Sequence, residues 1–411
     1  MAGLVERLLE RRLMSYQQAF LSGLNWHGAT SASGVHVTED TALGWVPFYA
    51  AVSLIADNVA ALPLHLLARQ SGGGAREAYW HPLYSILHDQ PNPRMTAYSF
   101  RQLLMTNVLT WGNGYAVIDW RPDGTVAALW PRRPDRMTVS LGSDGMPVGT
   151  YVDERGQQEV IPFYRLFHLM GPSSDGITGR SVISLLREAI GRGIAIERFG
   201  ARFFANDARP GVVLKHPKTL SDIARNRLKD DWEANHQGSQ NAWRPAVLEE
   251  GMTLETVGVP PEDAQFLQTA QMTSRQMAMA FRIPPHMMGD VTGSTSWGTG
   301  IEQQSIGFVT FTLLPWLNLW EQTIRRDLLG PAEQGPLYPK HNVNGLQRGD
   351  FKSRMEGYAI GRQWGIYSAD DVLAKEDENP QPNGQGKTYL VPLNMTTADK
   401  LGQPAPDATG A

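Results

Sequence analysis

Apolar positions in the first part of the chain follow two different spacings. Residues 45–62 carry them at helical intervals until a proline ends the pattern, and Thr96 is placed to cap a helix over residues 97–110. Residues 115–170 instead alternate short apolar runs with proline and glycine, which is typical of antiparallel strands. The patterns therefore predict an α+β domain over roughly residues 1–175.

Two long helical patterns flank a short segment in the middle of the chain. They cover residues 179–207 and 262–281, and each carries an apolar stripe. Between them, residues 211–259 predict a strand, a polar helix capped by Thr219, and a hairpin. If the ends of this small α/β insert meet, the two long helices pack antiparallel and carry it.

A polar stretch, GDVTGSTSWGTG, separates the second long helix from a third one. It fills residues 289–300 and contains no lysine or arginine. Thr299 and Glu302 form a capping-box pattern for a helix over residues 300–328. Pro315 lies inside this helix and should kink it, because proline removes a backbone hydrogen bond. The helix is apolar on most sides, so it needs burial by its own domain or by other subunits.

The two ends of the chain carry weaker patterns. Residues 1–24 predict a short amphipathic helix and lack the uncharged apolar core of a signal peptide. Near the other end we expect one helix within residues 349–365 and another capped by Ser368. The remainder, residues 380–411, is rich in proline, glycine and threonine and is expected to be extended or disordered.

Composition narrows the possible functions. The 411 residues carry a net charge of −4 and no cysteine. A missing basic excess argues against tight DNA binding, although transient contact with a polyanion stays open. The lack of cysteine excludes disulfides, thiolate catalysis and cysteine-ligated zinc. The apolar runs at 43–68 and 306–320 are interrupted by proline or polar residues, so neither is expected to span a membrane.

No motif for catalysis, cofactor binding or metal binding stands out. The Gly-Lys-Thr at residues 386–388 resembles part of a phosphate-binding loop, but Gln381 occupies the position of the first glycine. The ten histidines are scattered, and no His/Asp/Glu/Ser set converges. We therefore expect no catalytic residue, no cofactor and no metal.

Four arginines of the first long helix share one face. At 3.6 residues per turn they fall within about 60° of each other, and they are Arg180, Arg187, Arg198 and Arg202. This face is either solvated and salt-bridged or turned toward a polyanion.

Several segments, in this order, resemble the portal proteins of tailed double-stranded DNA bacteriophages with long tails. The similar segments are SLIADNVAALPLHLL, HPLYSILHDQPNPRMTAYSFRQLLMTNVLTWGNGYAVI, GRSVISLLREAI, MAFRIPPHMMGD, GIEQQSIGFVTFTLLPWL and GRQWGIYSADDVLAKEDENPQPNGQGKTYLVPLN. Together they span about residues 40–395.

The resemblance implies a portal-type fold in a ring oligomer. The expected parts are a wing over 1–180 that includes a peripheral arm over 1–40, stem helices over 181–208 and 262–283, a clip over 209–261, a tunnel loop over 286–300, a kinked helix and wing return over 301–345, a helical crown over 346–395 and a flexible tail over 396–411.

The same resemblance implies a ring of twelve copies at one capsid vertex. DNA would enter through its channel during packaging and leave at infection, and the ring would connect head and tail. Expected partners are the chain itself, double-stranded DNA bound transiently and without sequence preference, the terminase large subunit, a head–tail adaptor, the major capsid protein and scaffold, with no membrane. The location would be the virion, after assembly in the host cytoplasm.

Residues with expected roles follow from this mapping. The tunnel loop would present Asp290, Thr292, Ser294, Thr295, Ser296, Trp297 and Thr299 to DNA, with Trp297 either in the channel or against a neighbouring subunit. The stem would turn Gln265, Gln268, Arg275, Arg198 and Arg202 toward the channel. The clip would meet terminase or adaptor through Lys215, Lys218, Arg225, Arg227, Lys229, Glu249 and Glu250. Subunits would meet through Phe308, Phe311, Pro315, Trp316 and Trp320.

Two other classes of protein stay open. One is another oligomeric virion component, such as an adaptor or tail protein. The second is an enzyme with an unrecognised active site, against which the missing convergent side chains argue.

Overall fold

The computed structural model describes residues 29–71, 73–205, 211–217, 219–236, 251–257, 263–290, 304, 306–343, 351–376, 378–390 and 392. Contacts between residues divide the chain into two units, Met1–Asn342 and Val343–Ala411. The amphipathic helix expected over residues 1–24 lies outside the described residues.

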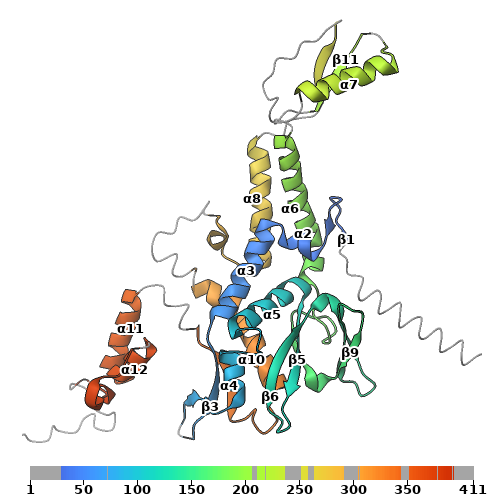
Figure 1. The fold of residues 1–411 in the computed structure, drawn as a ribbon. Coiled ribbons are helices and arrows are strands. Elements are labelled where there is room, and N and C mark those ends of the chain that lie inside the picture. The colour runs from blue at the N-terminus through green and yellow to red at the C-terminus, as the bar shows by residue number, and fades with distance from the viewer. Residues whose placement is uncertain are drawn as a thin grey trace, which may run out of the picture. The chain divides into compact units, whose positions relative to one another are not determined.

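The first unit contains a body in which short helices pack against small sheets (Figure 1). Thr96 caps α5 by accepting a hydrogen bond from the Ser99 amide, as predicted. The body helices are α2 (Glu39–Leu43), α3 (Val46–Ala61), α4 (Pro82–His88), α5 (Ala97–Trp111) and α10 (Leu314–Leu328).

The predicted antiparallel strands are confirmed within residues 115–170. One sheet has the order β10 (Leu166–Met170), β5 (Asn113–Trp120), β6 (Val126–Arg132). A second has the order β7 (Met137–Leu141), β8 (Pro147–Val152), β9 (Gln158–Ile161). A third joins distant parts of the chain in the order β13 (Leu337–His341), β3 (Leu64–Arg69), β4 (Ala75–Glu77). The short strands β1 (Ala29–Thr30) and β2 (His36–Val37) also pair antiparallel.

Helix α10 forms the centre of the body core. It packs against β10 on one side and β13 on another. Trp320 contacts Phe100 edge-on and also meets Phe167, with ring centroids 6.4 and 6.0 Å away. The indole is only 1% exposed. This aromatic cluster joins helix α5, strand β10 and helix α10 into one core.

The start of helix α6 (Val182–Ala205) is held by a backbone junction, which we define as Gly112, Asn113, Gly171 and Gly179. The Gly171 amide donates to the Gly112 carbonyl at 2.9 Å. A Cβ atom on Gly179 would lie 2.0 Å from that same carbonyl oxygen, so only glycine fits there. The Asn113 side chain bonds both the amide and the carbonyl of Gly179, at 2.7 and 2.8 Å.

His168 completes this junction from strand β10. Its Nε2 lies 2.9 Å from Asn113 Oδ1, and because that oxygen already accepts from the Gly179 amide, we assign Nε2 as a protonated donor. Burial lowers the pKa of His168 to about 4, and the nearby Arg326 guanidinium adds to the effect. A neutral imidazole is therefore part of the junction at neutral pH.

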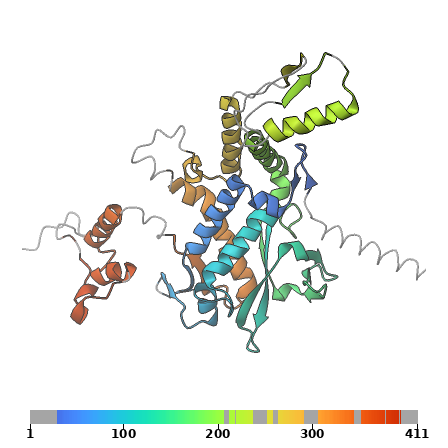
Figure 2. The same cartoon turned by 45° about the horizontal axis from the view of Figure 1, so that its top comes forward.

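Helices α6 and α8 (Asp263–Ala280) lie side by side in both views (Figures 1 and 2). They pack against each other and run antiparallel, since the chain leaves along one and returns along the other. Ile190 and Met277 are buried, and Arg192 donates to Gln276 across the pair at 2.8 Å. On the body side, a Cβ on Gly193 would lie 2.1 Å from the Trp45 ring, so this glycine lets the indole pack directly on α6.

The insert between these two helices contains β11 (Gly211–Lys215), α7 (Asp222–His236) and β12 (Thr253–Val257), with β11 and β12 antiparallel. The prediction that Thr219 caps the polar helix is wrong. The helix begins three residues later, and the Ser221 hydroxyl accepts from the Ala224 amide at 3.3 Å. The strand expected before the hairpin turn at Glu250 lies outside the described residues.

The third long helix is irregular where we expected a kink. A π-helical segment, η4 (Phe308–Leu313), leads directly into α10, so Pro315 lies in the first turn of an α-helix rather than in the interior of one. A proline fits there because the amide it lacks would have no α-helical partner. The prediction that Pro315 lies in the interior of an α-helix is therefore wrong, and the kink stays a prediction. The proposed capping box at Thr299 and Glu302 lies outside the described residues.

The second unit contains α11 (Phe351–Gln363), α12 (Ala369–Lys375) and the 3-10 helix η6 (Pro382–Lys387). Ser368 caps α12 in a full capping box with Asp371, as predicted. The expectation of an extended or disordered tail is wrong for residues 382–387. There the Gln381 amide donates to Asp370 at 2.9 Å, and Gly386 packs directly on that carboxylate.

No helix among the described residues is both long and apolar enough to cross a membrane.

We expect the substitution Gly179→Ala to destabilise the protein by roughly 2–3 kcal/mol, because the new methyl group would overlap the Gly112 carbonyl oxygen. Chemical denaturation of the purified protein measures this loss. The matched control is Gly335→Ala, where a Cβ meets nothing within 4 Å, and there the change should stay within about 0.5 kcal/mol. Equal stability of both variants would show that the junction tolerates a side chain.

The depressed pKa of His168 predicts stability that falls as the pH is lowered. The unfolded chain binds a proton near pH 6.5 and the folded chain only near 4, so the contribution is complete above about pH 6.5 and is lost as the pH falls toward 4. Between pH 7 and pH 5 this amounts to about 2 kcal/mol of unfolding free energy. In urea titrations at pH 7 and pH 5, His168→Gln should remove most of this difference in unfolding free energy. The control His88→Gln, at a more exposed histidine, should leave the difference unchanged.

Candidate channel and subunit-contact surfaces

Helix α8 presents one continuous exposed stripe. The stripe residues recur at intervals of four, three and four, which places them on one face of an α-helix, and they are Gln268, Met272, Arg275 and Met279. Two of the four belong to the set expected to face a channel, and Gln265 lies on the same helix with its side chain outside the described part. Met272 and Met279 were not predicted, although their spacing from Arg275 could have revealed them.

The only charge on this stripe is already bound. Arg275 Nε donates to Asp290 Oδ2 at 2.5 Å, and Nη2 lies 3.5 Å from Oδ1. The Arg275 guanidinium is half exposed, whereas Asp290 is largely covered. This charge-assisted bond raises the pKa of Arg275, so the cation persists at any physiological pH but is paired. The structure thus brings together two residues that the sequence placed 15 positions apart and in different roles.

The chain between α8 and η4 is fixed at both of its described ends. On the α8 side, Arg282 adopts a positive φ of 57° and the Ile283 amide closes back onto the Ala278 carbonyl at 2.8 Å. The 3-10 helix η3 (Pro285–Met288) follows and ends at Gly289, whose φ is 83°. On the η4 side, the Thr312 hydroxyl donates to the Arg282 carbonyl. Both ends of the intervening segment are therefore attached to the same helix terminus.

The rest of the expected tunnel loop is not described. Thr292, Ser294, Thr295, Ser296, Trp297 and Thr299 lie outside the described residues. Of that set only Asp290 has a described position, and its carboxylate faces Arg275.

The arginines of α6 do not behave as one face. Arg187 pairs with its neighbour Glu188 at 3.3 Å, and Glu188 in turn accepts from the Ala32 amide at 2.8 Å. Arg198 and Arg202 are exposed near the far end of the helix. The Arg187–Glu188 pair favours the salt-bridged interpretation at Arg187. Arg198 and Arg202 lie on the surface, where a polyanion could reach them.

Only part of the expected subunit-contact set is on the surface. Phe311 is 69% exposed, Pro315 is exposed and Trp316 is half-buried. The expectation that a neighbouring subunit buries Phe308 and Trp320 is wrong, because their own subunit already buries both. Exposed Ile306 and Leu314 were not predicted, yet they flank Phe311 and extend an apolar surface over η4 and the start of α10.

The insert presents charge on α7 and β11. Lys215, Arg225 and Arg227 are exposed, and Arg225 pairs with Asp222 at 3.2 Å. Lys218, Glu249 and Glu250 lie outside the described residues, and the Lys229 side chain lies outside the described part of α7. Ile223, which is 83% exposed beside these charges, was not predicted.

Metal-ligating geometry is missing from the part of the chain that the structure describes, where no three His, Asp or Glu side chains come together. The buried histidines instead form hydrogen bonds within the body. The His341 amide, for example, donates to Glu321 Oε1 at 2.8 Å, and its ring Nδ1 lies 3.0 Å from the same oxygen.

Comparison with known proteins gives a consistent result. The family model described as phage portal protein matches residues 47–377. The probable portal protein of Streptomyces phage phiC31 is 35% identical over 380 residues, which are 90% of this chain and 82% of that protein. The portal protein of Enterobacteria phage HK97 is 31% identical over 382 residues, 91% and 88% of the two chains.

Solved structures agree at the level of the fold. An HK97 family phage portal protein from Corynebacterium diphtheriae matches with a TM-score of 0.58 at 15% identity, covering 76% of this chain and 97% of that one. A chain from the neck of an empty gene transfer agent particle, computed with C6 symmetry, has a TM-score of 0.58 at 24% identity, covering 83% and 93%. With a family model over most of its length and two close relatives of nearly full coverage, the chain belongs to the phage portal protein family.

Proposed function

We propose that twelve copies of this chain form a ring at one vertex of a phage capsid, and that the genome enters and leaves through the central channel. Family membership supports this proposal, and so do the titles of two matching structures, which name particle necks with C6 and C12 symmetry. A cyclic ring needs a different contact surface on each side of every subunit, because each copy meets its neighbours head to tail.

The observation that carries the channel assignment is the exposed stripe of α8. It consists of two methionines, a glutamine and an arginine, and the chain runs from this helix directly into the segment between η3 and η4. DNA that must slide needs few strong phosphate contacts, since each lysine or arginine pair adds affinity and holds the duplex. Because Asp290 neutralises Arg275, the stripe offers polar and apolar contact with no net charge.

In this arrangement the body is the wing, α6 and α8 are the stem, and the insert is the clip. The wing of one copy meets the next through the apolar surface of Ile306, Phe311, Leu314 and Pro315, which its own subunit leaves exposed. The exposed charges of β11 and α7 fit a docking role for the clip, with terminase during packaging and a head–tail adaptor afterwards. Capsid protein and scaffold are further partners, and the second unit is the crown.

The protein acts without catalysis in this proposal. It supplies a passage and a platform, while a separate terminase motor supplies the work. Assembly takes place in the host cytoplasm, and the ring remains in the virion.

Purified full-length protein should assemble into ring particles with a central opening, visible by negative-stain electron microscopy. Phe311→Glu should raise the protein concentration needed for ring assembly at least tenfold, because it places a charge in an apolar contact. Leu141→Glu, at an exposed apolar residue on strand β7, is the matched control and should assemble normally. A stable monomer at high wild-type concentration would contradict the ring.

The Arg275–Asp290 pair gives opposite expectations for its two partners. Asp290→Asn removes the carboxylate charge that faces Arg275, so ring particles should bind double-stranded DNA more tightly and with a steeper salt dependence. Arg275→Gln should not tighten binding. Filter binding at two salt concentrations measures both, and tighter binding by the Arg275 variant would contradict a channel face that avoids phosphate contacts.

A further inference from the structure

An open groove of about 630 Å³ lies at one end of the sheet β13–β3–β4. Its lining includes Ala68, Arg69, Arg76, Trp80, Glu333 and Leu337. Figure 1 shows β3 in the body, away from the helices α6 and α8. None of these residues belongs to the stripe of α8 or to the apolar surface around Phe311.

The floor of the groove is apolar and continuous with the core. Ala68 stands opposite Leu337 on one side and opposite Arg76 on the other, so these three side chains share one face of the sheet. Ala68 and Leu337 are buried, whereas Arg76 is exposed. The floor therefore offers an apolar seat with a guanidinium beside it.

The charge that the groove can offer a ligand is positive. Arg69 lies over the Tyr338 ring at 4.9 Å, and neither Arg69 nor Arg76 forms an ion pair with any residue that the structure describes. The one acidic wall residue, Glu333, is already engaged.

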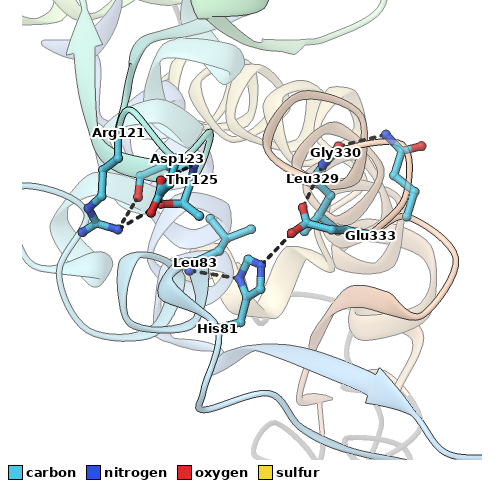
Figure 3. Close-up of polar contacts among 10 residues, drawn as sticks. His81, Leu83, Arg121, Asp123, Thr125, Leu329, Gly330 and Glu333 are labelled. Carbon is cyan, nitrogen blue, oxygen red and sulfur yellow. Dashed lines mark hydrogen bonds and ion pairs between the residues drawn. The ribbon is translucent and has the colours of Figure 1, made fainter.

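Figure 3 shows how Glu333 is held. Its Oε1 lies 3.1 Å from His81 Nε2, and its Oε2 accepts from the Gly330 amide at 2.9 Å. Burial opposes ionisation, but these two hydrogen bonds together keep the pKa of Glu333 below its usual value. His81 is itself fixed, because its Nδ1 accepts from the Leu83 amide at 3.2 Å. The carboxylate thus shapes the wall between α10 and β13 and leaves the Arg76 guanidinium, on the same face as Ala68 and Leu337, uncompensated.

An exposed tryptophan completes the groove. Trp80 is 64% exposed and touches the edge of the His81 ring, with centroids 5.5 Å apart. Tryptophan and arginine are the residues most enriched among those that dominate protein–protein binding energy. The Trp80 indole and the Arg76 guanidinium are both exposed in the lining of this groove, so both can contact a partner.

We propose that this groove binds an extended acidic peptide segment of a separate protein. An apolar side chain of that segment sits on Ala68 and Leu337, a carboxylate pairs with Arg76, and Trp80 covers the backbone. A nucleic acid would match the charge, but it has no side chain for a narrow apolar floor. The inference goes beyond the passage of DNA, since it assigns a docking site for protein to the sheet β13–β3–β4.

The test uses full-length protein and a dye-labelled hexapeptide of alternating glutamate and leucine, with fluorescence anisotropy as the readout. Wild-type protein should bind it at least tenfold more tightly than the matched lysine–leucine hexapeptide. Arg76→Glu should weaken binding tenfold or more, and Trp80→Ala at least threefold. All substituted side chains are exposed, so folding should be retained and circular dichroism checks it.

Arg121→Glu is the matched control. Arg121 is an exposed arginine of the β5–β6 turn that bonds the Val126 carbonyl at 3.2 Å, and Figure 3 shows it apart from the His81–Glu333 contact. This variant should change binding less than twofold. Equal binding of both hexapeptides, an Arg121 effect as large as that of Arg76, or equal competition by double-stranded DNA would each overturn the proposal.

Discussion

The close approach of two backbone segments at Gly112 and Gly179 is the constraint on which the rest of the first unit depends. It joins the end of α5 to the residues that open α6, at a distance that excludes any side chain. Asn113 satisfies the buried polar groups of both segments, and the Ser181 hydroxyl adds a bond to the Thr110 carbonyl at 3.2 Å. The starting point and direction of α6 are therefore fixed by main-chain contacts, and Trp45 against Gly193 fixes the helix a second time three turns on.

Between this junction and the insert, several charged side chains on α6 and α8 pair with nearby residues. Arg187 is paired with Glu188 and Arg275 with Asp290, whereas Arg192 keeps its charge and bonds the neutral side-chain amide of Gln276. Exposed pairs of this kind add little stability, commonly below about 1 kcal/mol each. Their effect is on the surface potential, because they remove cations from a surface that would otherwise attract phosphate.

Local signals made much of the fold predictable from the sequence. Thr96 and Ser368 predicted the starts of their helices, because a helix cap involves only three neighbouring residues. Proline and glycine predicted the strand ends within residues 115–170. Contacts between distant residues were not predictable. No pattern near residue 337 predicts that β13 pairs with β3, and none predicts that Asp290 pairs with Arg275 instead of facing solvent. Trp320 was assigned to a subunit contact because apolarity alone cannot distinguish burial within a chain from burial between chains.

The π-helical segment at Phe308–Leu313 has a consequence for how the chain tolerates changes in length. A π-turn holds one residue more than an α-turn, so losing a residue there would restore an ordinary α-helix and keep the later side chains in phase. The same loss within α10 would rotate every later side chain by about 100° and move Trp320 and Ile324 out of the core. The π-helical segment thus allows the chain between α8 and α10 to become one residue shorter while the core residues of α10 stay in register.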